Sequence, residues 1–169
     1  MSKPLEWQRG FTLLEVLVAL VVLSIGLIGL AGLQSVALKQ NYNAYLRSQA
    51  VALAYDMADR VRSNNLGAAK GFYHNPAPTS HSDCTTMVGC AADQLAENDM
   101  SEWAADLGAL LPMGAGLVCQ DSTPESPPSP LVCDGTGPTH VVRVVWDDNR
   151  DGVATVTDPN EAVIVSFRP

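Results

Sequence analysis

The feature of this sequence that most constrains its fold is an uninterrupted apolar run near the beginning. Between Val16 and Leu33 only Ser24 is polar, and no residue in that stretch is charged. A run of about 18 or more apolar residues is long enough to cross a bilayer core as a helix. Apolar residues cover the whole circumference of this helix, whereas a soluble amphipathic helix shows a stripe. The run therefore predicts a membrane-spanning helix.

Polar residues at the start of the run distinguish it from a simple anchor. Glu15 immediately precedes it, and residues 1–10 carry Lys3 and Arg9. An unpaired acid at the centre of a bilayer costs about 2.5–3.5 kcal/mol on insertion scales, and less near a helix end. Glu15 is therefore a candidate functional residue that needs a cationic partner.

The segment G-F-T-L-L-E, residues 10–15, resembles the cleavage site of type IV pilins. The resemblance implies that residues 1–10 are a leader peptide, that a prepilin peptidase cuts after Gly10, and that the new amine of Phe11 is methylated. It also implies that Glu15 pairs with the Phe11 amine of a neighbouring subunit. A low dielectric strengthens such a pair and penalises either charge alone. The expected pairing thus supplies the partner that Glu15 lacks.

Charge indicates the orientation and the kind of partner. Lys3 and Arg9 place the N-terminus in the cytoplasm by the positive-inside rule, so the chain beyond the single span lies outside the inner membrane. The net charge is −8, and removal of a leader with Lys3, Arg9 and Glu6, net +1, makes it −9. General DNA binding needs a basic surface. No nucleic-acid partner is expected.

The four cysteines, Cys84, Cys90, Cys119 and Cys133, fit an oxidising compartment. They contain no C-x-x-C pair and the three histidines are scattered, so a zinc site is disfavoured. Two disulfides are expected, and four cysteines allow three pairings. The local pairing, Cys84–Cys90 with Cys119–Cys133, closes two surface loops and is preferred, although the sequence alone does not settle it.

The helix that begins at Phe11 is predicted to extend far beyond a membrane. No proline follows the leader until Pro76, so the helix can run to about residues 63–65, roughly 80 Å at 1.5 Å per residue. Its transmembrane half covers residues 11–33 and its periplasmic half residues 34–65. Asn64-Asn65-Leu66-Gly67 is a plausible stop, with Gly67 as a left-handed cap.

An apolar stripe at helical spacing marks the periplasmic half. We expect this stripe to pack on the chain's own domain, and packing on neighbouring subunits is the alternative. Its members are Leu46, Ala50, Leu53, Met57 and Val61.

Residues 66–169 are expected to form a globular domain with a second helix. Asp99 and Glu102 have the spacing of a capping box, and Pro112 follows the predicted helix. The apolar face of this helix is more consistent with core packing than with an exposed binding patch. That face contains Trp103, Leu107, Leu110 and Leu111.

The last third of the chain has the composition of β-strands. Residues 141–146 and 162–167 are rich in β-branched and aromatic residues, residues 117–119 suggest a short strand, and residues 153–157 suggest another. Residues 122–130, S-T-P-E-S-P-P-S-P, are expected to form an exposed loop. The fold class is α+β: a long N-terminal helix packed on a small antiparallel sheet, which resembles the pilin fold.

The segment D-D-N-R-D-G, residues 147–152, matches the opening of a calcium loop. Asp147, Asn149 and Asp151 would be the first oxygen ligands, and Asp158 lies at the twelfth position, where a longer Glu is usual. Asp, Asn and Gly also favour turns for local reasons, so an acidic turn is the preferred interpretation. Calcium is kept as a possible ligand, and no other cofactor is expected.

Within the family, the layout most resembles the minor pilins called PilV. The resemblance lies in R-G-F-T-L-L-E-V-L-V-A-L, D-M-S-E-W-A-A-D-L-G-A-L-L-P and V-V-W-D-D. It implies a subunit that primes polymerisation at the pilus tip and supports twitching motility and attachment. The implied partners are other minor pilins, the major pilin, a tip adhesin, the prepilin peptidase and an inner-membrane assembly platform driven by a cytoplasmic ATPase.

Other functions fit parts of the sequence. A pseudopilin of a type II secretion system shares the same N-terminal features. A displayed binding module, either an adhesin or a DNA-uptake receptor, is an alternative of a different class. An enzyme is disfavoured, because the sequence has no nucleophile elbow, metal-ligand cluster or phosphate-binding loop.

Overall fold

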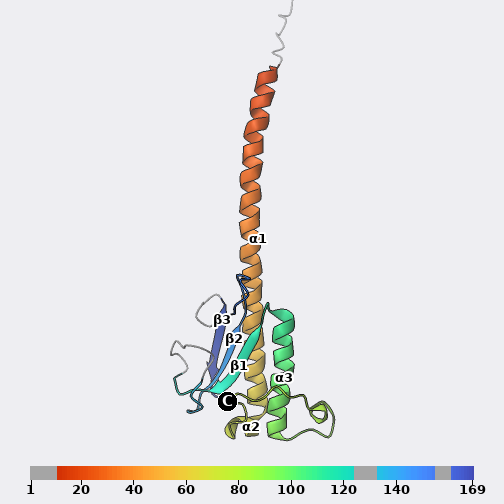
Figure 1. Ribbon diagram of the computed structural model, residues 1–169, viewed down its shortest axis with the longest axis vertical. Helices are drawn as coiled ribbons and strands as arrows, with labels where there is room; N and C mark the ends of the chain where they lie inside the picture. The colour runs from red at the N-terminus through yellow and green to blue at the C-terminus, as the bar shows by residue number, and fades with distance from the viewer. Residues whose placement is uncertain (1–10, 124–132, 155–160) are drawn as a thin grey trace, which may run out of the picture. The chain divides into compact units, whose positions relative to one another are not determined.

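The computed structural model describes residues 11–123, 133–154 and 161–169 (Figure 1). The leader, most of the proline-rich loop and residues 155–160, which include Asp158, lie outside this description. The chain divides into two compact units, one ending at Tyr42 and the other beginning at Asn43. The elements in chain order are α1 (Leu13–Ser63), α2 (Asn65–Ala69), η1 (Ser82–Thr85), α3 (Ala92–Leu110), β1 (Ala115–Gln120), β2 (His140–Val145) and β3 (Ala162–Phe167).

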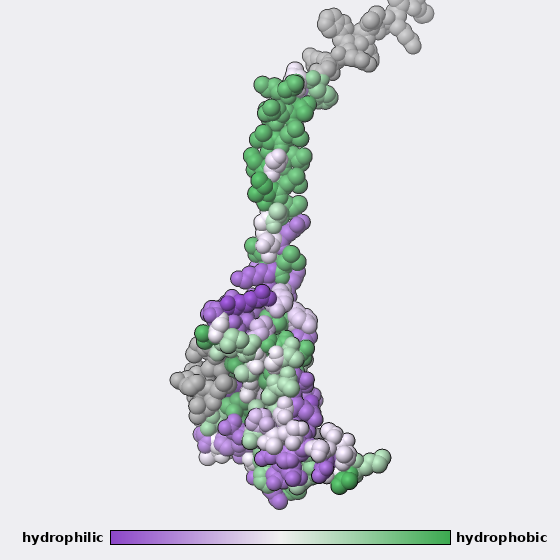
Figure 2. All heavy atoms as spheres, turned by 45° about the vertical axis from the view of Figure 1, so that its right-hand side comes forward, coloured by the Kyte–Doolittle hydropathy of each residue, from purple (hydrophilic) through white to green (hydrophobic). Residues whose placement is uncertain are grey.

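Helix α1 is continuous over 51 residues, as the absence of proline predicts. In the first unit every described residue of this helix is exposed. Figure 2 shows apolar side chains over the visible face of the upper part of that segment, and hydrophilic ones where it approaches the domain. Nothing in the described chain covers this part of α1.

The second part of α1 has the predicted buried stripe. Each of the five expected stripe residues is buried, and they share one core with residues of α3 and the sheet. The Trp103 indole Nε1 on α3 donates to the Leu53 carbonyl of α1 at 2.9 Å. The stripe therefore packs within its own domain, and the apolar face of α3 is largely core, with only Leu110 substantially exposed among its four predicted members.

The expected cap at Gly67 is wrong. Helix α1 ends at Ser63, and Asn64 starts the short helix α2 by accepting from the Gly67 amide at 3.0 Å. Gly67 is helical, and a Cβ on it would lie 2.5 Å from the Asn64 side chain. Its lack of a side chain serves this close approach. The positive φ of 77° falls later, at Gly71.

The expected start of the second helix is also wrong. Helix α3 begins at Ala92, where the Gln94 side chain accepts from the Ala91 amide at 3.1 Å, so Asp99 and Glu102 lie inside the helix. Asp99 is buried and accepts from the Tyr73 hydroxyl, and Arg60 lies 3.5 Å from its carboxylate. Burial raises the pKa of Asp99 despite these contacts. Asp99 and Glu102 both contact Arg60 and thereby connect α3 to α1, and neither caps a helix.

Glu102 is the other acid that contacts α1. Its carboxylate accepts from Arg60 at 2.8 Å and from the Asn98 amide at 2.9 Å. These two hydrogen bonds lower the pKa of Glu102.

The sheet is antiparallel with the order β1-β2-β3. Six buried residues make β2 its centre. Val142 and Val144 face the core shared with the helices, while Val141 packs with Leu117 and Cys119 in a second cluster. The two faces of β2 are thus both covered, which explains the near-continuous apolar character of its sequence. The suggested strand over residues 153–157 is absent at Val153 and Ala154, the two of these residues that the structure describes.

Candidate functional site

The first turn of α1 is built on Thr12. Its Oγ1 accepts from the Glu15 amide at 3.3 Å, and its carbonyl accepts from the amides of Glu15 and Val16 at 3.1 and 3.3 Å. Thr12 therefore caps the helix, and Thr12-Leu13-Leu14-Glu15 has the sequence of a capping box. This cap was not among the predicted features, although the T-x-x-E spacing at residues 12–15 is its sequence signal.

Glu15 and Phe11 are both exposed at this helix start. The Phe11 side chain is 82% exposed, and Gly10 lies outside the described residues. Within residues 11–123, 133–154 and 161–169, the Glu15 carboxylate has no hydrogen bond or ion pair. A carboxylate near a helix N-terminus is stabilised by the helix dipole. Because the dipole occupies none of the carboxylate oxygens, they remain available to a cation from another chain.

The apolar segment of α1 that follows Glu15 is exposed on all sides, so lipid or other helices can contact its whole circumference. Its large side chains are all half-exposed or more, and the 18-residue window that qualifies as a membrane span has none of its residues buried. Ser24, the one polar residue of the run, donates to the Leu20 carbonyl at 2.7 Å, which satisfies its hydroxyl within the helix. By length and composition this is the one candidate span among the described residues.

Two protein families match the chain at its N-terminal side. The prokaryotic N-terminal methylation motif matches residues 8–31, and the family described as Type IV pilin Tt1218 matches residues 32–101. The matches adjoin and together cover more than half of the chain. The chain is a type IV pilin. Neither the comparison with curated proteins nor the comparison with solved structures found a match.

As a type IV pilin with a methylation motif, the chain is a component of a pilus or pseudopilus. Its α+β architecture, a long apolar helix with a three-stranded antiparallel sheet, is consistent with the type IV pilin fold. The motif implies processing by the prepilin peptidase and assembly with other pilins and membrane machinery. The family is structural, not enzymatic.

The cysteines are joined in the local pairing. Cys84–Cys90 closes the loop that contains η1, with Cα atoms 4.8 Å apart. Cys119–Cys133 joins the end of β1 to the residues that precede β2, with Cα atoms 6.1 Å apart.

The histidines are not brought together. His81 contacts Glu97 at 2.7 Å, His74 Nδ1 accepts from the Gln120 amide at 3.3 Å, and His140 is buried at the start of β2. The described part of the chain has no group of three or more His, Cys, Asp or Glu residues that could hold a metal ion.

Three of the predicted calcium ligands lie together in a turn after β2. Asp147 is buried and accepts from the amides of Asp151 at 3.2 Å and Gly152 at 2.9 Å. Asn149 accepts from the Asp151 amide at 2.8 Å, and Asp151 accepts from the Val153 amide at 2.9 Å. The side-chain oxygens thus support the turn by local hydrogen bonds, as expected for the acidic-turn interpretation.

The fourth predicted ligand, Asp158, lies outside the described residues. Calcium binding therefore stays a prediction.

Proposed function

We propose that this pilin is a minor pilin of a type IV pilus, of the PilV type, that primes assembly and belongs to the tip complex. Twitching motility and surface attachment would depend on the filament that it helps to start. The observation that carries the proposal is the Glu15 carboxylate, which has no partner in the described chain and directly precedes the exposed apolar run of α1 inside a pilin methylation motif.

The proposed mechanism begins with cleavage after Gly10. Cleavage creates an ammonium group on Phe11, which the peptidase methylates. The carboxylate of Glu15 in an adjacent subunit then pairs with this ammonium in a medium of low dielectric, where each charge alone is strongly disfavoured. This pair would set the register between subunits.

The proposed location changes during assembly. Before assembly, the apolar part of α1 spans the inner membrane with its N-terminus in the cytoplasm. During assembly it leaves lipid for a filament core made of similar helices. The domain from Asn43 onward remains outside and would select among other minor pilins, the major pilin and a tip adhesin.

Incorporation of a Glu15→Ala variant tests this mechanism. We expect cleavage of the leader to continue and the amount of the protein in sheared filaments to fall about tenfold or more, which corresponds to the loss of a pair worth at least ~1.4 kcal/mol. Ser24→Ala is the matched control, because the Ser24 hydroxyl bonds to its own helix. Normal incorporation of Glu15→Ala would reject the charge pairing.

There are two alternatives to this proposal. The first keeps the same N-terminal chemistry, and the second gives the domain a different role. A pseudopilin of a type II secretion system would co-purify with secretion components instead of pilus minor pilins after cross-linking in cells. A tip-displayed adhesin module would bind host cells or glycans in the absence of other pilins. Co-purification with pilus minor pilins, without binding of the isolated protein to cells, favours the proposed role.

A further inference from the structure

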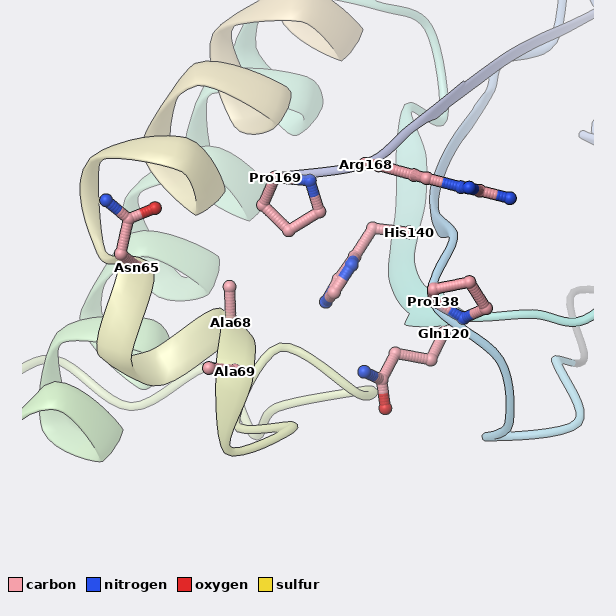
Figure 3. A pocket seen from close by; sticks show the side chains of 8 residues that line it. All are labelled: Asn65, Ala68, Ala69, Gln120, Pro138, His140, Arg168 and Pro169. Atoms are coloured by element: carbon pink, nitrogen blue, oxygen red, sulfur yellow. The ribbon is translucent and has the colours of Figure 1, made fainter.

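A pocket of about 510 Å³ lies within the second unit, at the end of the sheet beside α2 (Figure 3). Its volume lies within the range of small-molecule binding sites. The pocket brings together α2, the last residue of β1, the first residue of β2 and the two residues after β3. Its lining consists of Asn65, Ala68, Ala69, Gln120, Pro138, His140, Arg168 and Pro169.

His140 is the unusual member of this lining. The residue is only 2% exposed, and neither ring nitrogen has a hydrogen-bond partner among the residues that the structure describes. The Phe167 ring lies 5.9 Å from the imidazole, centroid to centroid, on the adjacent strand. Buried polar groups are nearly always paired, since an unpaired donor or acceptor costs about 1–3 kcal/mol. His140 therefore has unused hydrogen-bonding capacity beside a cavity.

The chemistry around His140 is largely uncharged. Burial lowers the pKa of His140, so the ring is neutral near pH 7 and offers one donor and one acceptor. Figure 3 shows the ring and the Gln120 carboxamide both directed toward α2, whereas the Arg168 side chain runs away from α2. Alanine and proline side chains supply the apolar part of the lining.

We propose that this pocket binds an uncharged amide group of a polypeptide, which pairs with the His140 imidazole and the Gln120 carboxamide. An amide presents one donor and one acceptor, which match a neutral imidazole. An anion would find one cation, Arg168, directed away from the ring. A sugar would leave several hydroxyl groups without partners against alanine and proline.

Access to the ring nitrogens requires a small movement, because both are shielded from solvent. In the pocket lining the Gln120 side chain is able to move, since its carboxamide makes no hydrogen bond within the described chain. Its backbone is fixed by pairing with His140 in the sheet. In a filament the bound amide would come from a neighbouring subunit; this source, but not the site, rests on the proposed function.

Histidine NMR of the full chain in detergent micelles tests the site without filament assembly. The probe is N-acetylprolinamide, with sodium acetate and methyl glucoside as the charged and sugar comparisons. We expect the amide alone to shift the His140 imidazole signals in a saturable manner with a millimolar Kd, as is typical for so small a ligand. The signals of His74 and His81 serve as internal references.

A pair of matched variants completes the test. Ala69→Leu places a larger side chain in the pocket lining at an exposed position of α2, and we expect it to weaken binding about tenfold or more. Ala105→Leu makes the same change at an exposed position of α3 and should leave binding unchanged. The proposal is rejected if the amide does not shift His140, if acetate or glucoside shifts it equally, or if Ala69→Leu binds normally. Failure of assembly in cells with normal amide binding would instead reject the proposed function.

Discussion

The two parts of α1 are one continuous helix but bury their side chains by different means. From Leu13 to Tyr42 every residue is exposed, and between Val16 and Leu33 the helix is apolar on all sides, whereas from Leu46 to Val61 an apolar stripe is buried against α3 and the sheet. A stripe finds its partners within the chain, but a helix that is apolar all round needs lipid or other helices. The second part of α1 therefore folds with its own domain, and the first part is left exposed for lipid or for other helices.

The largest expected effect comes from removing the core side chain that joins α3 to α1. Trp103→Ala loses a fully buried indole and its hydrogen bond to Leu53, so we expect the free energy of unfolding to fall by about 3–5 kcal/mol. Urea unfolding of the full chain in micelles measures it. Leu110→Ala, at an exposed position of the same helix, should change it by less than about 1 kcal/mol.

The contrasting variant lies in the first part of α1. Leu23→Ala removes an exposed apolar side chain, so the unfolding free energy of the domain should stay constant while recovery in filaments falls. A loss of domain stability in this variant would break the division between the two parts of the helix.

The disulfides should rank next. Cys119 and Cys133 are separated by 14 residues, and replacing both with Ser should cost about 3 kcal/mol by the loop-entropy relation. Cys84 and Cys90 are separated by 6 residues, so their replacement should cost about 2 kcal/mol. Thermal unfolding of the two double variants compares them. An equal or reversed order would show that strain or denatured-state structure, instead of chain entropy, controls the effect.

Acid should weaken the domain through His140. Because burial lowers the pKa of His140 from 6.5, the unfolded state binds the proton more tightly, and stability falls as the pH drops below about 6.5 toward the folded-state pKa. Arg168 lines the same pocket, and Arg62 lies over the neighbouring Phe167 ring. Both side chains are cations, so neither would stabilise a protonated His140. The difference in unfolding free energy between wild type and His140→Gln isolates this contribution.

In that comparison the wild type should lose more stability than His140→Gln between pH 7.5 and pH 5. Asp99 has a raised pKa and acts in the opposite direction, since its contribution to stability is lost as the pH rises. Because Asp99 is present in both proteins, its contribution cancels in the difference between them. Parallel pH profiles would contradict the effect of His140.

The smallest expected effect is that of calcium. Because the oxygens of Asp147, Asn149 and Asp151 already accept from amides of their own turn, we expect no binding heat at millimolar calcium. Asp151→Ala should have the same thermal stability with and without calcium. A saturable heat that this variant abolishes would establish a calcium site.

The sequence predicted the parts of the fold that depend on periodicity. The buried stripe of α1 and the core face of α3 follow from apolar spacing. The β-branched and aromatic runs at residues 141–146 and 162–167 predicted β2, which lies one residue earlier, and β3.

Helix ends were predicted less well, because local motifs do not reveal tertiary partners. Asp99 resembles an N-cap in sequence, yet it lies in mid-helix, where Tyr73 and Arg60 from distant parts of the chain contact its carboxylate. The Asn64 cap of α2 depends on similar detail, since the same side chain also donates to the Ala92 carbonyl at 2.8 Å. The pocket around His140 has no sequence signal, because its lining comes from four separate segments.

N-terminal mass spectrometry of the protein, recovered from membranes that contain its native peptidase, tests the central claim most directly. The account predicts a mature chain that begins at N-methyl-Phe11, with residues 1–10 removed. A chain that still begins at Met1 would contradict it, because Phe11 would then lack the ammonium group that Glu15 is proposed to bind.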